Sequence, residues 1–89
     1  MIEQIFSIYD SKAELYGPPI KAHNKGSILR SFQDVANNPE DPIGKHPEDF
    51  TLFHIAEFDS ATGKYKNLPA PVSVGTAHEF IKQPDALQN

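Results

Sequence analysis

The chain contains no cysteine, so it forms no disulfide and holds no zinc ion through thiolates. With 89 residues it has little surface to bury, and small chains without such cross-links tend to gain stability by self-association. The length predicts a single domain, which we place at residues 1–84, with a flexible tail at residues 85–89. We expect this domain to form a homodimer or a larger homo-oligomer.

Long apolar runs are also missing, so the sequence offers no membrane-spanning segment. The first residues, MIEQIFSIYD, lack the basic stretch and the long apolar stretch that make up a secretion signal. An apolar content of 38% and a charged content of 22% are typical of a folded chain rather than a disordered one. These features predict a folded intracellular protein with no membrane partner.

The chain has no excess of basic charge and no catalytic motif. Its formal net charge is −4 at pH 7, whereas proteins that coat nucleic acid nonspecifically are strongly basic. Its five glycines are spread singly, and the sequence contains no phosphate-binding loop, dinucleotide-binding motif or nucleophile elbow. We therefore expect neither a condensing protein nor an enzyme.

One stretch, GKHPEDFTLFHIAEFD at residues 44–59, concentrates potential metal ligands and acid–base groups. One interpretation is a metal-dependent enzyme that uses His46 and His54. However, Pro47 prevents a helical histidine pair of the kind found in zinc enzymes, and alternation along a strand places His54 beside the apolar Leu52. The acids lie at turns and strand ends, where carboxylates accept backbone N–H groups. We therefore predict no metal site and no cofactor.

The second half of the chain is similar to the first at an offset of 49 residues. At this offset, residues of the same type are aligned. The turn pair Asp10-Ser11 aligns with Asp59-Ser60, the aromatic Tyr16 with Tyr65, and Gly26, near a helix start, with Gly75. This pattern favours an internal duplication of one strand–hairpin–strand–helix unit. The alternative is two ordinary hairpins that share turn chemistry.

The first unit spans about residues 1–36. A β-branched and aromatic strand precedes the turn at Asp10-Ser11. The returning strand meets Pro18-Pro19, which is typical of an edge strand or of an early exit from the sheet. The next segment has apolar residues at helical spacing, with Ser27 as the predicted N-cap, and it ends before Pro39.

The second unit begins with the strongest strand pattern in the chain, at residues 50–59. Both faces of this strand carry apolar residues, which predicts a central position in the sheet. Strict alternation would place His54 and Phe58 on the same face. The hairpin loop has Gly63 where the first unit has Glu14, so we expect the two turns to differ.

A short helix ends the second unit, with Thr76 and Glu79 as a capping box and Pro84 as its stop. The Pro-rich segment at residues 37–49 is expected to be a loop that joins the first unit to the second at residues 50–83. Together these elements predict an α+β fold, a small antiparallel sheet with two short helices in the order ββαββα.

The charges are polarised along the sequence. Residues 20–30 contain three basic residues and no acid, whereas residues 40–59 contain six acids and one lysine. The basic segment leads into the start of the first helix, where backbone N–H groups favour an anion. The candidate nucleic-acid contacts, through phosphates and through base stacking, are Lys21, Lys25, Arg30, Tyr9 and Tyr16. The alternative is a solvated loop and helix, with tyrosines that pack the sheet.

The stretch HPEDFTLFHIAEFDSATG at residues 46–63 resembles a signature of the small nonstructural protein of gokushovirus-type microviruses. These are small icosahedral bacteriophages with circular single-stranded DNA. The upstream strand IFSIYDS, the Pro-Pro segment and a helix that ends near NNPED are also similar to that family. The resemblance covers residues 1–68 and brings no catalytic residue with it.

This resemblance implies a nonenzymatic accessory protein of viral DNA replication or of single-strand production and packaging, made in the cytoplasm of the infected bacterium. Single-stranded DNA would then bind through the local basic patch. The alternative is a protein-interaction module that binds a phage or host replication factor, or capsid precursors, without contacting DNA. Its candidate contact residues are Lys45, His46 and Glu48.

Overall fold

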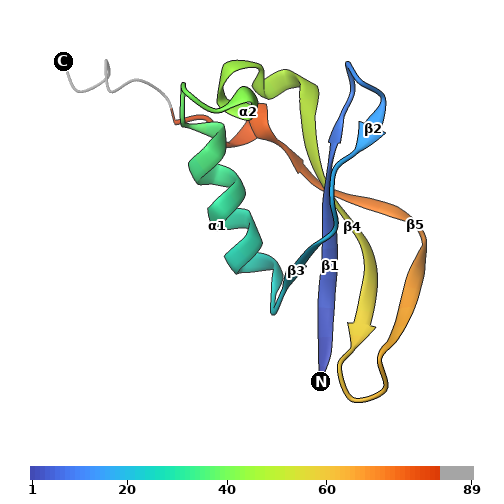
Figure 1. Ribbon diagram of the computed structural model, residues 1–89. Coiled ribbons are helices and arrows are strands. Elements are labelled where there is room, and N and C mark those ends of the chain that lie inside the picture. Colours follow the sequence, from blue (N-terminus) through green and yellow to red (C-terminus); the bar gives the residue numbers. More distant parts are fainter. Residues whose placement is uncertain (83–89) are drawn as a thin grey trace.

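The computed structural model describes residues 1–82, and the predicted helix stop at Pro84 and the predicted tail lie outside them. The antiparallel sheet contains β1 (Ile2–Asp10), β2 (Leu15–Tyr16), β3 (Ile20–Ala22), β4 (Phe50–Asp59) and β5 (Lys64–Thr76) (Figure 1). β1 and β4 pair in the centre, β5 flanks β4, and β2 and β3 pair with successive parts of β1. The predicted small α+β fold is confirmed.

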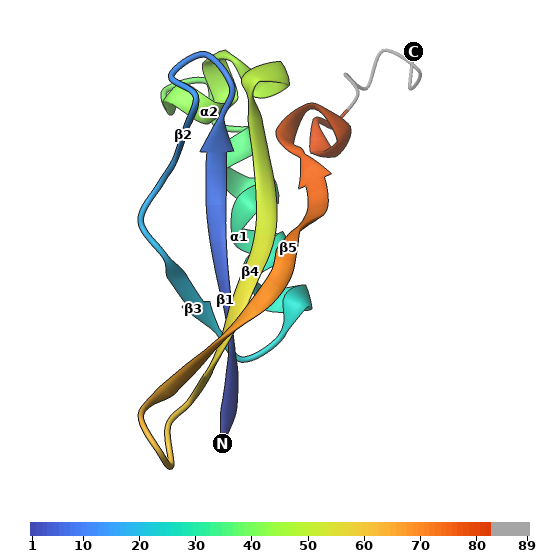
Figure 2. The ribbon, with the colours of Figure 1, turned by 90° about the vertical axis from the view of Figure 1, so that its right-hand side faces the viewer.

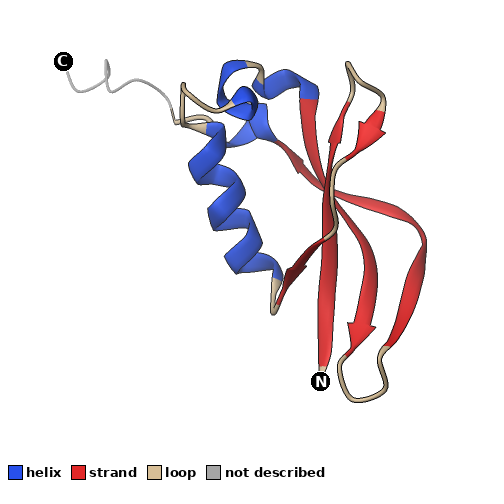
Figure 3. Ribbon diagram, in the orientation of Figure 1, coloured by secondary structure: helices blue, strands red, loops and turns tan. Residues whose placement is uncertain are grey.

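The helical elements are α1 (Lys25–Ala36), α2 (Pro42–Lys45) and two 3-10 helices, η1 (Pro47–Asp49) and η2 (Ala77–Phe80). They lie to one side of the sheet, with α1 as the longest of them (Figure 3). Phe32 of α1 meets Phe80 of η2 edge to face, with ring centroids 5.9 Å apart, so both predicted helices lie over the same face. None of the helices within residues 1–82 is long and apolar enough to cross a membrane.

The hydrophobic core lies between this face of the sheet and α1. Phe6 of β1 and Leu52 of β4 are fully buried there. Four buried residues of the helical elements pack against them: Ile28, Phe32, Ala36 and Ala77. The opposite face of the central strands has no helix over it within residues 1–82 (Figure 2).

α1 begins three residues earlier than the sequence predicted, and Asn24 rather than Ser27 is its N-cap. The Asn24 Oδ1 atom accepts the backbone N–H of Ser27 at 2.9 Å, and the Ser27 hydroxyl donates to the Asn24 carbonyl at 3.1 Å. The prediction of Ser27 was wrong because Asn and Ser cap helices equally well. The first turn of the helix also tolerates Gly26, which lies between them.

β4 is central, as predicted, but its faces do not alternate strictly. His54 pairs with Phe6, whereas Ala56 pairs with Ile5, so one extra residue of β4 forms a bulge between these pairs. The bulge leaves His54 on the helix side of the sheet and turns Ala56 and Phe58 to the opposite face. The prediction that His54 and Phe58 share a face was therefore wrong, because a bulge changes the two-residue period.

The Pro-rich connector is ordered into two short helices, so the prediction of a loop was wrong. Asp41 caps α2 by accepting the N–H of Ile43 at 2.9 Å, and Pro42 occupies the first helical position. His46 ends α2, and Pro47 begins η1 immediately afterwards. Proline suits the first position of a helix because its missing N–H needs no partner there. The Asp-Pro pair was thus a helix start rather than only a turn.

The returning strand of the first unit is interrupted, as Pro18-Pro19 predicted. Gly17 leaves β2 but still contacts β1: its N–H donates to the Ile8 carbonyl at 2.8 Å, and its carbonyl accepts the Ser7 hydroxyl at 2.8 Å. β3 then resumes pairing with β1. Because β2 and β3 act as one interrupted edge strand, the order ββαββα describes the fold.

β5 forms the other edge of the sheet and contains Pro69 and Pro71. β4 pairs with β5 up to Asn67 and again from Val72, so residues 68–71 break the register between the two strands. Proline has no N–H to offer a further strand. This edge is therefore interrupted in its middle.

The two hairpin turns are alike, although Glu14 and Gly63 led us to expect a difference. The N–H of Glu14 donates to the Asp10 carbonyl at 2.8 Å, and the N–H of Gly63 donates to the Asp59 carbonyl at 2.7 Å. Glu14 has φ 59° and Gly63 has φ 75°, so both are left-handed. The prediction was wrong because the surrounding turn holds even a glutamate in this conformation.

The aspartate that precedes each turn fixes it. The Asp10 Oδ1 atom accepts the N–H of Lys12 at 3.0 Å, and the Asp59 Oδ1 atom accepts the N–H of Ala61 at 2.9 Å. The hydrogen bond from Ala61 lowers the pKa of the Asp59 carboxyl below its ordinary value, and the nearby N-terminal amine acts in the same direction. These bonds explain why Asp-Ser begins both turns.

The matched turns give a paired prediction. A residue with a side chain costs about 1–2 kcal/mol of strain at positive φ, and glycine avoids this strain. Glycine also loses more conformational entropy on folding, which offsets part of the gain. Glu14→Gly is therefore expected to raise the free energy of unfolding by roughly 0.5–1 kcal/mol, and Gly63→Ala to lower it by a similar amount. No atom of residues 1–82 lies within 4 Å of a Cβ built at Gly63, so the substitution measures backbone strain alone. Urea denaturation checks this, and equal midpoints for the two variants would contradict it.

Candidate nucleic-acid interface

The helix-free face of the sheet carries three neighbouring aromatic rings, Tyr9, Tyr16 and Phe53, which we call the aromatic cluster. Tyr9 and Tyr16 pair across β1 and β2, with ring centroids 4.7 Å apart. Phe53 joins them from β4, at 5.5 Å from Tyr16 and 6.3 Å from Tyr9. These distances are those of interacting aromatic rings. The pairing of three strands therefore assembles the cluster.

The aromatic cluster reaches the protein surface. Tyr16 is 47% exposed, and Tyr9 and Phe53 are half-buried beside it. The structure thus brings together the two predicted tyrosines and adds Phe53, which the sequence analysis missed. The alternation of β4 assigned a face to Phe53, but only the register opposite Ser7 places it beside the tyrosines.

A second aromatic pair lies on the same face, near the β4–β5 turn. Phe58 pairs with Tyr65, with ring centroids 4.8 Å apart, and Tyr65 is 65% exposed. Phe58 also lies opposite Glu3 of β1, which places the pair on the helix-free face. Exposed aromatic rings therefore occur at two positions along this face.

Lys21 lies on this face too, but it is engaged with a buried acid. Glu3 is only 7% exposed, and its Oε1 atom lies 3.2 Å from the Lys21 Nζ atom. The contact is an ion pair without hydrogen-bond geometry, since Oε1 accepts no hydrogen bond in the described part of the chain. The Nδ1 atom of His23 lies 3.9 Å from the other carboxylate oxygen. Lys21 therefore compensates Glu3 before it can attract a phosphate.

The other two predicted basic contacts lie on α1. Lys25 is the first residue of the helix and Arg30 lies half-way along it, and both are exposed. α1 covers the opposite face of the sheet (Figure 1). Since Arg30 belongs to this helix, it lies on a different side of the sheet from the aromatic cluster. The three basic residues are thus divided between two faces.

A second candidate surface lies where α2 and η1 meet the first hairpin turn. Nitrogen and carboxylate oxygen atoms of His46, Glu48 and Asp49 lie within 4.8 Å of one another. They border a hollow of about 500 Å³ whose lining includes Asp10 and Lys12. His46 and Glu48 are exposed, so water can solvate them without a bound ion.

Two of the predicted partner contacts, His46 and Glu48, line the hollow of this second surface. Lys45, His46 and Glu48 are all exposed. Lys45 is the last residue of α2 and Glu48 lies in η1, so the two flank His46. The three residues therefore follow one another closely in one exposed segment, in which Lys45 lies outside the lining of the hollow.

His54 lies apart from this group of residues. Its ring stacks on Phe6 with centroids 5.0 Å apart, and its Nε2 atom donates to the Ala56 carbonyl at 3.1 Å. His54 is thus packed, as predicted, with one hydrogen bond across the bulge. A shared metal site of His46 and His54 has no support in this arrangement.

Comparison with known protein families identifies the chain. The model of a family described as Phage ORF5 protein matches residues 3–80, which include nearly all of β1 and every later element through η2. The chain belongs to the Phage ORF5 protein family. At a stringent threshold, no curated protein and no solved structure matches it. Both candidate surfaces of this phage protein lie within the matched residues.

Proposed function

We propose that this Phage ORF5 family member is a nonenzymatic accessory protein of viral DNA replication, or of single-strand production and packaging, that binds single-stranded DNA on the helix-free face of its sheet. Family membership supports a phage protein. The resemblance of residues 46–63 supports the narrower assignment to gokushovirus-type microviruses, whose genomes are single-stranded DNA. The cytoplasm of the infected bacterium is then its place of action.

The aromatic cluster is the observation that carries this proposal. Bases of a single strand stack on exposed aromatic side chains, and each stacked base contributes about 1–3 kcal/mol. Tyr16 presents an exposed ring beside Tyr9 and Phe53, and Tyr65 presents another on the same face. A DNA strand that follows this face would stack one of its bases at each of the two positions.

Phosphate contacts make the smaller contribution in this proposal. The net charge is −4, and Lys21 is already paired with Glu3. Lys25 and Arg30 would contact the DNA only if the bound DNA strand continues past β3 towards α1. The proposed binding is therefore weak and dominated by stacking. Its affinity should depend only modestly on salt, because few phosphates are contacted.

Fluorescence anisotropy with a dye-labelled oligothymidine at low salt tests the proposal. The natural protein is expected to bind at micromolar concentrations. Tyr16→Ala is expected to weaken binding roughly 5- to 150-fold, which corresponds to the loss of one stacked base. Lys25→Ala and Arg30→Ala together should flatten the salt dependence, because each phosphate contact contributes about −0.7 to the log–log slope.

Val72→Ala is the matched control. Val72 is 55% exposed on the sheet, but it pairs with His54 and so faces the helix side. This variant should bind DNA as the natural protein does. Two results would sink the DNA proposal: no micromolar binding by the natural protein, or equal affinities for the Tyr16 and Val72 variants.

A second candidate function is a protein-interaction module without DNA contact. The hollow of about 500 Å³ beside His46 and Glu48 favours it, because it offers a concave polar surface. Substituting Lys45, His46 and Glu48 with alanine would then abolish capture of a phage or host replication factor, or of capsid precursors, from infected cells. The DNA titration of the same variant would stay unchanged, so the two functions can be separated.

A further inference from the structure

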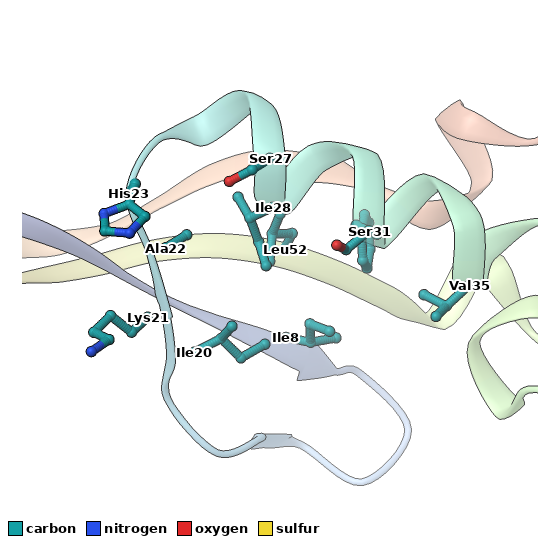
Figure 4. Close-up of a pocket in the computed structure, with 11 residues that line it drawn as sticks. Ile8, Ile20, Lys21, Ala22, His23, Ser27, Ile28, Ser31, Val35 and Leu52 are labelled. Atoms are coloured by element: carbon teal, nitrogen blue, oxygen red, sulfur yellow. The ribbon is translucent and has the colours of Figure 1, made fainter.

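A groove lies between α1 and the β3 side of the sheet, and we call it the β3–α1 groove. It encloses about 470 Å³, which is within the usual range of binding pockets. Figure 4 shows sheet residues on one side of it and helix residues on the other. Its lining is mainly apolar: Ile8, Ile20, Ala22, Ile28, Val35 and Leu52. The groove can therefore accept a large apolar side chain.

β3, the strand beside the groove, has one free side. It pairs with β1 through Ile20, Lys21 and Ala22, and within residues 1–82 no strand pairs with its other side. All three of these residues also line the groove. Because the free edge of a strand can add an extended peptide as a further strand, a peptide bound there would run along the groove.

The β3 edge beside the groove carries basic residues. The side chains of Lys21 and His23 are 63% and 76% exposed and face Glu3 on the helix-free side of this edge, and Lys25 begins α1 beside them. Glu3 faces Lys21 and His23, but it is buried and offsets only one charge. The exposed acid Asp34 lies nearer the other end of α1. Charge complementarity thus favours acidic residues in the part of a peptide close to His23.

We propose that the β3–α1 groove binds an extended acidic peptide segment of a protein partner. The segment pairs with the free side of β3 and places one large apolar side chain between α1 and the sheet. Main-chain hydrogen bonds provide affinity, and the apolar lining selects the anchoring side chain. This site goes beyond the proposed DNA interface, since it lies on the helix side of the sheet and the aromatic cluster on the other.

The probe is an array of synthetic octapeptides with β-branched residues, glutamates at one end, and leucine, phenylalanine or alanine at the centre. Nuclear magnetic resonance of isotope-labelled protein follows their binding. Leucine and phenylalanine peptides are expected to shift the amide signals of residues 20–23 and of α1. They should also slow hydrogen exchange of the β3 amides, because strand addition occupies them. Alanine peptides should bind about tenfold more weakly, because they lack the apolar anchor.

A substitution that fills the groove tests its location. Ser31 is exposed and lines the groove from α1, so Ser31→Phe is expected to weaken peptide binding about tenfold. Gln33→Phe is the matched control, because Gln33 is exposed on the same helix but is not among the lining residues. This control should leave the peptide affinity unchanged. His23→Glu should weaken binding of the glutamate peptides by charge repulsion.

Three results would overturn the proposal. The first is that no peptide of the array binds with a Kd below about 1 mM. The second is that both phenylalanine variants bind the peptides equally well. The third is a shift of signals without slower exchange at β3, which indicates occupation of an apolar site without strand addition. Ser31→Phe should leave the DNA titration unchanged, so failure of this proposal and failure of the DNA proposal are distinguishable.

Discussion

Phe6→Ala is expected to remove about 3–5 kcal/mol from the free energy of unfolding, the typical cost of truncating a buried phenylalanine. Phe6 is fully buried at the centre of β1, where it meets the core residues of α1 and the ring of His54. A domain of this size has a total stability of only about 4–13 kcal/mol. The variant should therefore melt at least about 12 °C below the natural protein. Thermal denaturation followed by circular dichroism measures the difference.

Ile2→Ala provides the control for this experiment. Ile2 lies on the same strand and the same side of it, but it is 53% exposed. Substitutions at such positions usually change stability by less than about 0.5 kcal/mol. If the Phe6 and Ile2 variants melted at the same temperature, the core assigned to the helix side of the sheet would be wrong.

Gly44→Ala is also expected to lower the free energy of unfolding, but for a different reason from Phe6→Ala. A Cβ at this position would lie 1.8 Å from the Asn38 carbonyl oxygen and 2.9 Å from that of Val35. Both obstacles are backbone atoms, so no side-chain rotation relieves the contact. α2 must therefore move away from the end of α1, at a cost of at least about 1–3 kcal/mol. Urea denaturation should show this loss, and amide signals of residues 38–49 should shift.

Gly26→Ala tests whether close approach, rather than loss of glycine, causes the damage. Gly26 lies in the first turn of α1, and the nearest atom to its built Cβ is the Asn24 Oδ1 atom at 3.4 Å. Alanine forms helices better than glycine, so this variant should gain about 0.5–1 kcal/mol. A loss of stability equal to that of the Gly44 variant would contradict the explanation.

Local sequence patterns predicted the strands and the main helix well. The strand pattern and the turn pair Asp10-Ser11 located β1, and apolar spacing located the helix that became α1. The boundary error at Ser27 arose because Asn24 offers an equivalent side-chain oxygen. The error on the faces of β4 had a different origin. The bulge opposite Ile5 and Phe6 depends on pairing with another strand, which no local pattern contains.

The candidate site was predictable only in part for the same reason. The correspondence of the two units drew attention to Tyr16, and the structure places it against Tyr9. The pairing of Lys21 with Glu3 could not be inferred, because it requires β3 to lie beside β1. Likewise, the separation of Arg30 from the tyrosines follows from which face α1 covers. Charges that are adjacent in sequence were thus divided by the tertiary fold.

The interrupted edges of the sheet limit how copies of this chain can join. Growth of a fibre by edge addition requires that each copy both offers and accepts a continuous edge. Within residues 1–82 no strand pairs with the outer side of β3, but Pro18 and Pro19 separate β3 from β2, and Pro69 and Pro71 interrupt β5. Neither edge is therefore continuous over the length of the sheet. The prolines at both edges are thus expected to disfavour open-ended polymerisation.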